Sequence, residues 1–107
     1  KQIQASKDLG ANKIELHTGS YVEAKGKDQV VELERLRAGA KYSGEIGLEV
    51  HAGHGLDYDT VEAVAKISEF TEFNIGHFLI GEAIFVGLEQ TITRMRDLMD
   101  IGRDQCE

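Results

Sequence analysis

Hydrophobic and polar residues follow two different spacings along this chain. Three short segments alternate at every second residue, as strands do, and the segments around them carry apolar residues three or four positions apart, as helices do. The predicted strands are Asn12–His17, Glu45–His51 and Glu72–Gly76. The predicted helices are Lys1–Leu9, Asp28–Ala40, a helix carrying Val61, Val64 and Ala65, a short helix from Phe78 to Val86, and a longer helix after Gly87. Strand and helix therefore alternate three times.

Two of the predicted helices have a distinct apolar edge. The inner edge of Asp28–Ala40 is predicted to consist of Val30, Leu33 and Leu36. One stripe of the last helix carries Leu88, Ile92, Met95 and Met99. Between the first strand and the second helix, Ser20–Lys27 is predicted to be a polar loop, and Asp57 or Asp59 is suited to cap the helix that follows the second strand.

The alternation of strand and helix favours a parallel sheet with helices packed outside it. The strand side under the helices must be apolar, which assigns to it Ile14, Leu16, Leu48, Val50, Phe73 and Ile75. The opposite side then carries Glu15, His17, Glu49, His51, Glu72 and Asn74. A barrel would place these polar groups inside, where those near the mouth can reach a substrate and deeper ones must be hydrogen-bonded or paired.

The predicted fold class is α/β, specifically the C-terminal portion of a TIM (β/α)8 barrel. Three units cannot close an eight-stranded barrel, and the chain opens inside a predicted helix without an initiator Met, as a truncated chain would. We interpret residues 1–107 as roughly the last three-eighths of such a barrel. The partial barrel comprises three βα units, a short phosphate-site helix and a C-terminal helix, with a tail at residues 104–107.

The charge and composition exclude several classes of partner. The net charge is −7 and the acidic residues are spread along the chain, whereas a nucleic-acid or anionic-membrane surface would need a basic patch. No stretch reaches the ~20 apolar residues that cross a bilayer, and no signal peptide is visible. The single cysteine, Cys106, cannot form an internal disulfide, which fits a reducing cytoplasm.

All four histidines, His17, His51, His54 and His77, lie at or just beyond the C-terminal end of a predicted strand. Substrates bind at that end in β/α folds, because the connecting loops and the helix N-termini converge there. The distribution of histidines therefore predicts a shared active site.

Gly53-His54-Gly55 places one imidazole between two glycines, which allow unusual backbone angles and a close approach to a ligand. Such a histidine can exchange a proton near neutral pH. The alternative is a tight strand-to-helix turn with a solvent-exposed histidine.

Asn74-Ile75-Gly76-His77 ends the third predicted strand directly before a short helix. Many barrels bind phosphate at this position with the backbone N–H groups of an extra short helix. The alternative is an ordinary connection in which Gly76 only makes room.

Glu15 is a candidate carboxylate at the barrel mouth, where it could orient a histidine or stabilise positive charge; otherwise it pairs with Lys13 or another barrel residue. Glu49 and Glu72 are predicted to be paired structurally. A zinc site built from His51, His54 and Glu15 lacks a third ligand at a motif spacing, so no metal is predicted.

Three segments together resemble the pyridoxine 5'-phosphate synthase family. They are Ile14-Glu15-Leu16-His17-Thr18-Gly19, the run Gly47-Leu48-Glu49-Val50-His51-Ala52-Gly53-His54-Gly55-Leu56, and Phe73-Asn74-Ile75-Gly76-His77-Phe78-Leu79-Ile80-Gly81. The resemblance extends from the first helix to about Arg103. It implies condensation of 1-deoxy-D-xylulose 5-phosphate with 3-amino-2-oxopropyl phosphate to form pyridoxine 5'-phosphate, with release of phosphate and water, in vitamin B6 biosynthesis.

The resemblance also implies roles for five residues. His54 matches the proton-donating histidine, and Gly55 a backbone contact to substrate. Gly76 and His77 match the turn that holds a phosphate through backbone amides. Glu15 matches a carboxylate that stabilises charge in the transition state. Family members need no metal or organic cofactor and form homo-oligomers, commonly octamers, in the cytoplasm.

The other catalytic histidine, the general-base glutamate and the basic residues of this family have no counterpart in the chain, so residues 1–107 alone are expected to be inactive. Two other functions fit the pattern of residues. One is a different phosphate-binding barrel, such as a sugar-phosphate isomerase or epimerase. The other is a non-catalytic module that binds a phosphorylated metabolite, or a half-barrel that dimerises.

Overall fold

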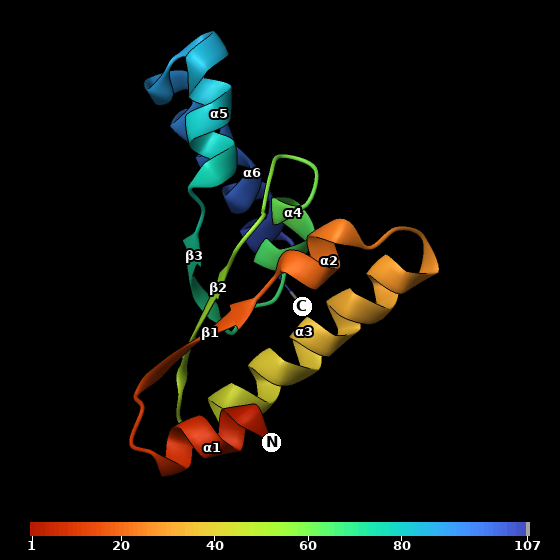
Figure 1. Ribbon diagram of the computed structural model, residues 1–107, viewed down its shortest axis with the longest axis vertical. Coiled ribbons are helices and arrows are strands. Elements are labelled where there is room, and N and C mark those ends of the chain that lie inside the picture. Colours follow the sequence, from red (N-terminus) through yellow and green to blue (C-terminus); the bar gives the residue numbers. More distant parts are fainter. Residues whose placement is uncertain (107) are drawn as a thin grey trace.

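The computed structural model describes residues 1–106. The strands are β1 (Lys13–His17), β2 (Glu49–Gly53) and β3 (Phe70–Asn74). The helices are α1 (Gln2–Asp8), α2 (Gly19–Glu23), α3 (Lys27–Glu45), α4 (Val61–Ala65), α5 (His77–Val86) and α6 (Leu88–Asp104). Figure 1 shows α5 and the start of α6 extending away from the sheet, at the opposite end of the molecule from α1.

The three strands form one parallel sheet in the order β1-β2-β3, which confirms the predicted α/β class. Residue His17 pairs with Gly53, and Gly53 pairs with Asn74, so the carboxyl ends of all three strands lie at one edge. The register between β2 and β3 shifts by one residue after Val50, which leaves Thr71 as an extra residue in β3.

The second strand begins later than predicted, because α3 continues through Glu45. The helix ends in a Schellman arrangement: the N–H of Leu48 donates to the carbonyl of Ser43, and that of Gly47 donates to the carbonyl of Gly44. Gly47 has φ +83°, a backbone conformation that glycine adopts without strain. The predicted strand start at Glu45 was wrong because the turn chemistry around Gly47 outweighs the alternation of side chains.

The third strand was predicted at Glu72–Gly76 and lies two residues earlier. Its pairing with β2 ends at Asn74, and Gly76 is already the N-cap of α5. The early start follows from Phe70, whose ring is buried in the core and whose N–H donates to the carbonyl of Ile67.

The predicted polar loop Ser20–Lys27 was partly wrong, because it contains most of the short helix α2. Tyr21 is buried in this helix and its hydroxyl donates to the carbonyl of Thr60. A tyrosine in a polar segment thus docks the segment on the core, and only Ala24 to Gly26 connect α2 to α3.

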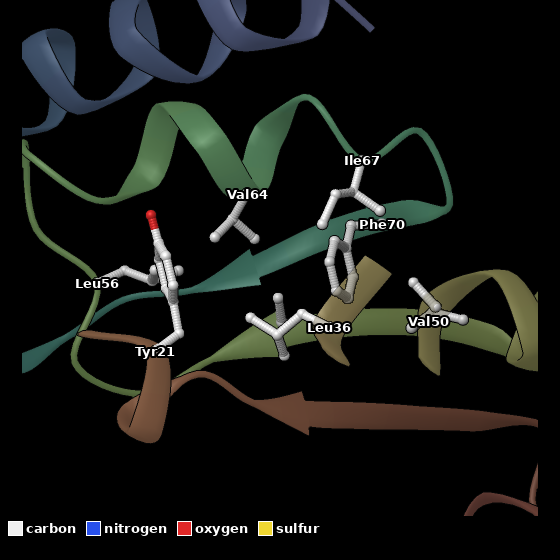
Figure 2. Packing of buried hydrophobic residues seen from close by; sticks show 9 residues of the cluster. Tyr21, Leu36, Val50, Leu56, Val64, Ile67 and Phe70 are labelled. Atoms are coloured by element: carbon white, nitrogen blue, oxygen red, sulfur yellow. The ribbon is translucent and has the colours of Figure 1, made fainter. Parts of the chain in front are cut away.

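The core lies between one face of the sheet and the helices α2, α3 and α4 (Figure 2). It consists of Tyr21, Leu36, Ala40, Val50, Ala52, Leu56, Val64, Ile67 and Phe70. Leu33, Leu16, Phe73 and Ile75 pack against this cluster, as the predicted apolar face required. Val30, which was predicted to lie on the inner edge of the helix, does not: its side chain is 61% exposed.

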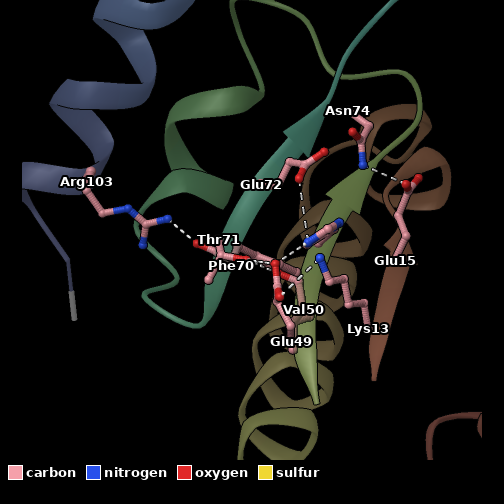
Figure 3. Close-up of polar contacts among 10 residues, drawn as sticks. Lys13, Glu15, Glu49, Val50, Phe70, Thr71, Glu72, Asn74 and Arg103 are labelled. Atoms are coloured by element: carbon pink, nitrogen blue, oxygen red, sulfur yellow. Dashed lines mark hydrogen bonds and ion pairs between the residues drawn. The ribbon is translucent and has the colours of Figure 1, made fainter. Parts of the chain in front are cut away.

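Helix α6 crosses α4 at close range through Gly102. A Cβ atom at this position would lie 2.5 Å from the carbonyl oxygen of Glu62 and 2.8 Å from the Cβ of Ala65. Arg103 adds hydrogen bonds from its guanidinium to the carbonyl of Ile67 and to that of Phe70, the second of which is drawn in Figure 3. These contacts fasten the end of α6 to the segment that leads into β3.

The predicted apolar stripe of α6 is buried only in part. Met95 is buried and Met99 half-buried, while Leu88 and Ile92 near the start of the helix are exposed. No helix among residues 1–106 is both long enough and apolar enough to cross a membrane.

Candidate functional site

The carboxyl ends of the three strands border a pocket of about 530 Å³. Its lining includes all five residues predicted for the site: Glu15, His54, Gly55, Gly76 and His77. The remaining lining residues are Leu56, Asn74, Ile75 and Phe78. Segments that are far apart in the sequence therefore meet at one edge of the sheet, on β1, in the loop after β2, and in the turn between β3 and α5.

His54 follows β2 directly and has an unusual backbone conformation. Its φ of 87° lies in the left-handed region, where a residue with a Cβ is rarely found, and the following Gly55 has φ 80°. These two residues turn the chain sharply away from the sheet. The His54 side chain is exposed at the rim rather than packed in the core.

The imidazole of His17 stacks on that of His54, with ring centroids 4.3 Å apart and an angle of 24° between the planes. His17 Nδ1 accepts a hydrogen bond from the N–H of Gly19 at 3.2 Å, so the proton of the neutral His17 ring is on Nε2. A Cβ at Gly19 would lie 2.6 Å from His17 Cε1 and 3.1 Å from His54 Cδ2. A side chain at position 19 would therefore force both rings to shift.

Glu15 points along the polar face of the sheet toward the pocket. Its Oε2 accepts a hydrogen bond of 2.8 Å from Asn74 Nδ2, which joins β1 to β3 (Figure 3). A Cβ at Gly53, on the strand between them, would collide with the Glu15 carboxylate. Neither Gly53 nor Asn74 was predicted to be a neighbour of the Glu15 carboxylate. Lys13, the alternative partner proposed for Glu15, pairs with Glu49, with 3.6 Å between Lys13 Nζ and Glu49 Oε2.

The N-terminus of α5 opens onto the same pocket. Gly76 is the N-cap, and no side chain caps the helix. A Cβ at Gly76 would meet no atom of residues 1–106 within 4 Å. The start of α5 is held by Phe78, whose ring packs edge-on against that of Tyr58 with 4.6 Å between the ring centroids. On the Tyr58 ring also lies the guanidinium of Arg94, with its Cζ 4.1 Å from the ring centre.

His51 lies deeper on the polar face and is not at the rim. It occupies the middle of β2, where Nε2 is 2.8 Å from Glu49 Oε1 and 3.7 Å from Glu72 Oε2 (Figure 3). The expectation that all four histidines gather at the strand ends was therefore wrong for His51. It holds for His17, at the end of β1, and for His54 and His77, just beyond β2 and β3.

The predicted structural pairing of Glu49 and Glu72 agrees with these contacts. The hydrogen bond from His51 is the largest cause that lowers the pKa of Glu49 below its usual 4.5, and the charge of Lys13 and the hydroxyl of Thr71 lower the pKa further. Within residues 1–106, no three His, Cys, Asp or Glu side chains are grouped so that they could hold a metal ion.

Three features of the site were not predicted from the sequence. The hydroxyl of Thr18, which is completely buried, is bonded to the loop that carries His54. Asn74 holds Glu15, and Tyr58 supports the start of α5. The His-Thr-Gly run was a visible signal for the first of these, but its partners are about 35 residues away along the chain.

Three parallel β/α units with an open helix N-terminus and an exposed histidine at the strand ends define an α/β protein with a pocket at the edge where proteins of this class bind small ligands. Comparison with known proteins specifies the family. Residues 1–101 match the family described as pyridoxal phosphate biosynthesis protein PdxJ, and the chain belongs to this family.

Several relatives are described as pyridoxine 5'-phosphate synthase. The chain is 57% identical over 106 residues to the protein of Caulobacter sp. (strain K31), 55% identical over 106 residues to that of Xanthobacter autotrophicus and 53% identical over 102 residues to that of Zymomonas mobilis. Each match covers 95% of this chain. The chain spans 42%, 41% and 40% of the respective relatives.

Proposed function

We propose that the protein containing this chain is a pyridoxine 5'-phosphate synthase. It would condense 1-deoxy-D-xylulose 5-phosphate with 3-amino-2-oxopropyl phosphate, form pyridoxine 5'-phosphate, and release phosphate and water. Support comes from family membership, from identity above 50% over nearly the whole chain, and from a pocket suited to a phosphorylated substrate.

The proposal includes the architecture of the whole protein. Residues 1–107 would form the C-terminal part of a TIM barrel, with α6 as the C-terminal helix. The predicted tail at residues 104–107 begins one residue too early, because Asp104 is the last residue of α6, and its final position lies outside the described residues. The parallel strands, the helices on one face and the paired polar groups on the other support a barrel wall.

The phosphate site is proposed at the N-terminus of α5. The first N–H groups of a helix have no partner within it and carry a partial positive charge, so they bind an anion even on a protein with net charge −7. Gly76 and His77 supply these amides. Because no neighbour among residues 1–106 occupies the space beside Gly76, close approach of a ligand explains the glycine.

His54 is proposed to donate a proton, and Glu15 to stabilise positive charge in the transition state. Both side chains line the pocket that contains the phosphate site. His54 is exposed and can exchange its proton with a ligand or water. Glu15 is held by Asn74, so its carboxylate is oriented before substrate binds, and Gly55 offers its backbone beside His54.

The need for cofactors, the cellular location and the oligomeric state are inferred from the resemblance to the family. We expect the reaction to need no metal or organic cofactor, as the resemblance to the family implies. We also expect a cytoplasmic homo-oligomer, commonly an octamer in this family. The exposed apolar side chains of α5, among them Ile84 and Phe85, favour self-association.

One observation carries the proposal: His54 and the uncapped N-terminus of α5 border the same pocket. To test it, residues 1–101 would replace the matching segment of the Caulobacter sp. (strain K31) synthase. The chimaera should form pyridoxine 5'-phosphate from the two substrates. His54→Gln in the chimaera should lower kcat by about 10²–10⁴, the usual contribution of one acid–base group.

The two alternatives predict different results. A segment from a sugar-phosphate isomerase or epimerase would yield a folded chimaera without synthase activity. A phosphometabolite-binding module would yield a chimaera that binds substrate without turnover, and His54→Gln would leave its ligand affinity intact. Either result, in a chimaera whose circular dichroism matches that of the relative, would contradict the proposal.

A further inference from the structure

The backbone at His54 has to be held in place. A residue with a Cβ atom is strained at φ 87°, and such conformations persist only where the surroundings impose them. Gly55 has φ 80° and cannot impose the conformation, because glycine is flexible there. The restraint must come from another element, and the end of β1 lies directly beside this loop.

Thr18 supplies the first restraint. Its Oγ1 lies 2.7 Å from the carbonyl oxygen of Gly53 and 2.6 Å from that of His54, so one hydroxyl proton is shared between two carbonyls of the turn. Its N–H also donates to the Gly53 carbonyl, at 2.8 Å. Thr18 is 0% exposed, so water does not compete for these hydrogen bonds.

His17 supplies the second restraint, on the side chain of His54. The stacked rings limit rotation of the His54 imidazole, and the hydrogen bond from Gly19 to His17 Nδ1 holds the His17 ring in turn. His17 does not line the pocket that contains His54 and His77; it lines the neighbouring hollow between α1 and α3, and Glu15 borders both. The contact of His17 with the pocket residues is its stacking on the His54 ring.

We propose that His17 and Thr18 are positioning residues that clamp His54 in the orientation for proton donation: Thr18 holds the backbone and His17 holds the ring. The inference rests on the proposed function, in which His54 is the proton donor. It assigns a role to the run His17-Thr18-Gly19 at the end of β1. None of these three residues lines the pocket, although Glu15 in the same strand does.

The test uses the chimaera described above and compares Thr18→Val with Thr18→Ser. Valine keeps the shape of threonine and removes the hydroxyl, whereas serine keeps the hydroxyl. Thr18→Val should lower kcat by about 10- to 100-fold with little change in KM, because misplacing a catalytic group by about 1 Å costs up to about 10². Thr18→Ser should retain most of the activity.

The decisive comparison repeats Thr18→Val in the His54→Gln background. If Thr18 acts through His54, the second substitution should leave kcat of His54→Gln nearly unchanged, because residues that act as a unit are not additive. A merely structural role would lower kcat by the same factor in both backgrounds. That additive result would overturn the inference.

The matched control is Thr91→Val in α6. Thr91 is also 0% exposed and its hydroxyl donates to a backbone carbonyl, that of Gly87, at 2.8 Å, but it lies outside the pocket. Thr91→Val should lower the melting temperature and leave kcat unchanged.

His17 provides a second route should Thr18→Val fold poorly, since the His17 side chain is exposed. His17→Phe keeps a ring to stack on His54, and His17→Ala does not. We expect kcat to fall in the order wild type, His17→Phe, His17→Ala; equal kcat values for all three would overturn the role of His17. If His54→Gln itself leaves kcat unchanged, the proposed function fails first. If only the His17 and Thr18 variants are without effect, the clamp alone is refuted.

Discussion

The side-chain amide of Asn74 donates a 2.8 Å hydrogen bond to Glu15 Oε2 and thereby joins the two outer strands of the sheet. Gly53, on the strand between them, has no Cβ and so leaves the space that the Glu15 carboxylate occupies. Asn74 thus orients the carboxylate and Gly53 leaves room for it, an arrangement that suits the proposed role of Glu15 in stabilising transition-state charge.

Asn74→Ala in the active chimaera should reduce kcat by about 10- to 100-fold, because Glu15 loses the donor that orients it. Asn74→Asp should be more harmful, since two neighbouring carboxylates repel each other. Steady-state kinetics separates kcat from KM. The control is Asn12→Ala, an exposed asparagine before β1. A raised KM with unchanged kcat would mean that Asn74 binds substrate and does not orient Glu15.

Gly102→Ala should destabilise the fold by about 1–3 kcal/mol, the usual cost of overpacking. The added Cβ would lie 2.5 Å from the Glu62 carbonyl oxygen, so α6 must move away from α4. Gly81→Ala in α5 is the matched control, because a Cβ there meets no atom of residues 1–106 within 4 Å. Thermal unfolding should show a lower melting temperature for Gly102→Ala alone; equal effects would contradict the close helix crossing.

Tyr21 should make stability depend on alkaline pH. Burial, and secondly the Asp57 carboxylate, raise the pKa of Tyr21 above its usual 10.0. As pH rises above about 10, the unfolded chain loses this proton before the folded chain does, so the folded state loses stability. The stability advantage over Tyr21→Phe should therefore be full below pH 10 and shrink above it. Urea unfolding at several pH values measures the difference; a constant difference would exclude the effect.

Residues 1–107 by themselves should form no pyridoxine 5'-phosphate. The chain spans 42% of the Caulobacter sp. (strain K31) relative, and the resemblance places the second catalytic histidine, the general base and the basic residues outside it. The measurement is product formation by the purified chain, with the chimaera as the positive control. Turnover by the chain alone would show that the site is complete without the remaining part.

Residue spacing was sufficient to predict the parallel α/β class and the two faces of the sheet. Val50 and Phe73 do face the helices, while Glu15 and Asn74 face the other way, because side-chain direction in a strand follows from position alone. Strand ends were less predictable. The start of β2 depends on hydrogen bonds around Gly47, which alternation of side chains does not encode.

The sequence by itself determined which residues could do chemistry, since a histidine between two glycines and a glycine before a short helix have properties that depend on local structure. Only the tertiary structure decided which residues meet. The stacking of His17 on His54, the bond of Thr18 to the His54 carbonyl, and the separation of His51 from the rim depend on strand register. Register is set by packing of the core between sheet and helices, which no local pattern contains.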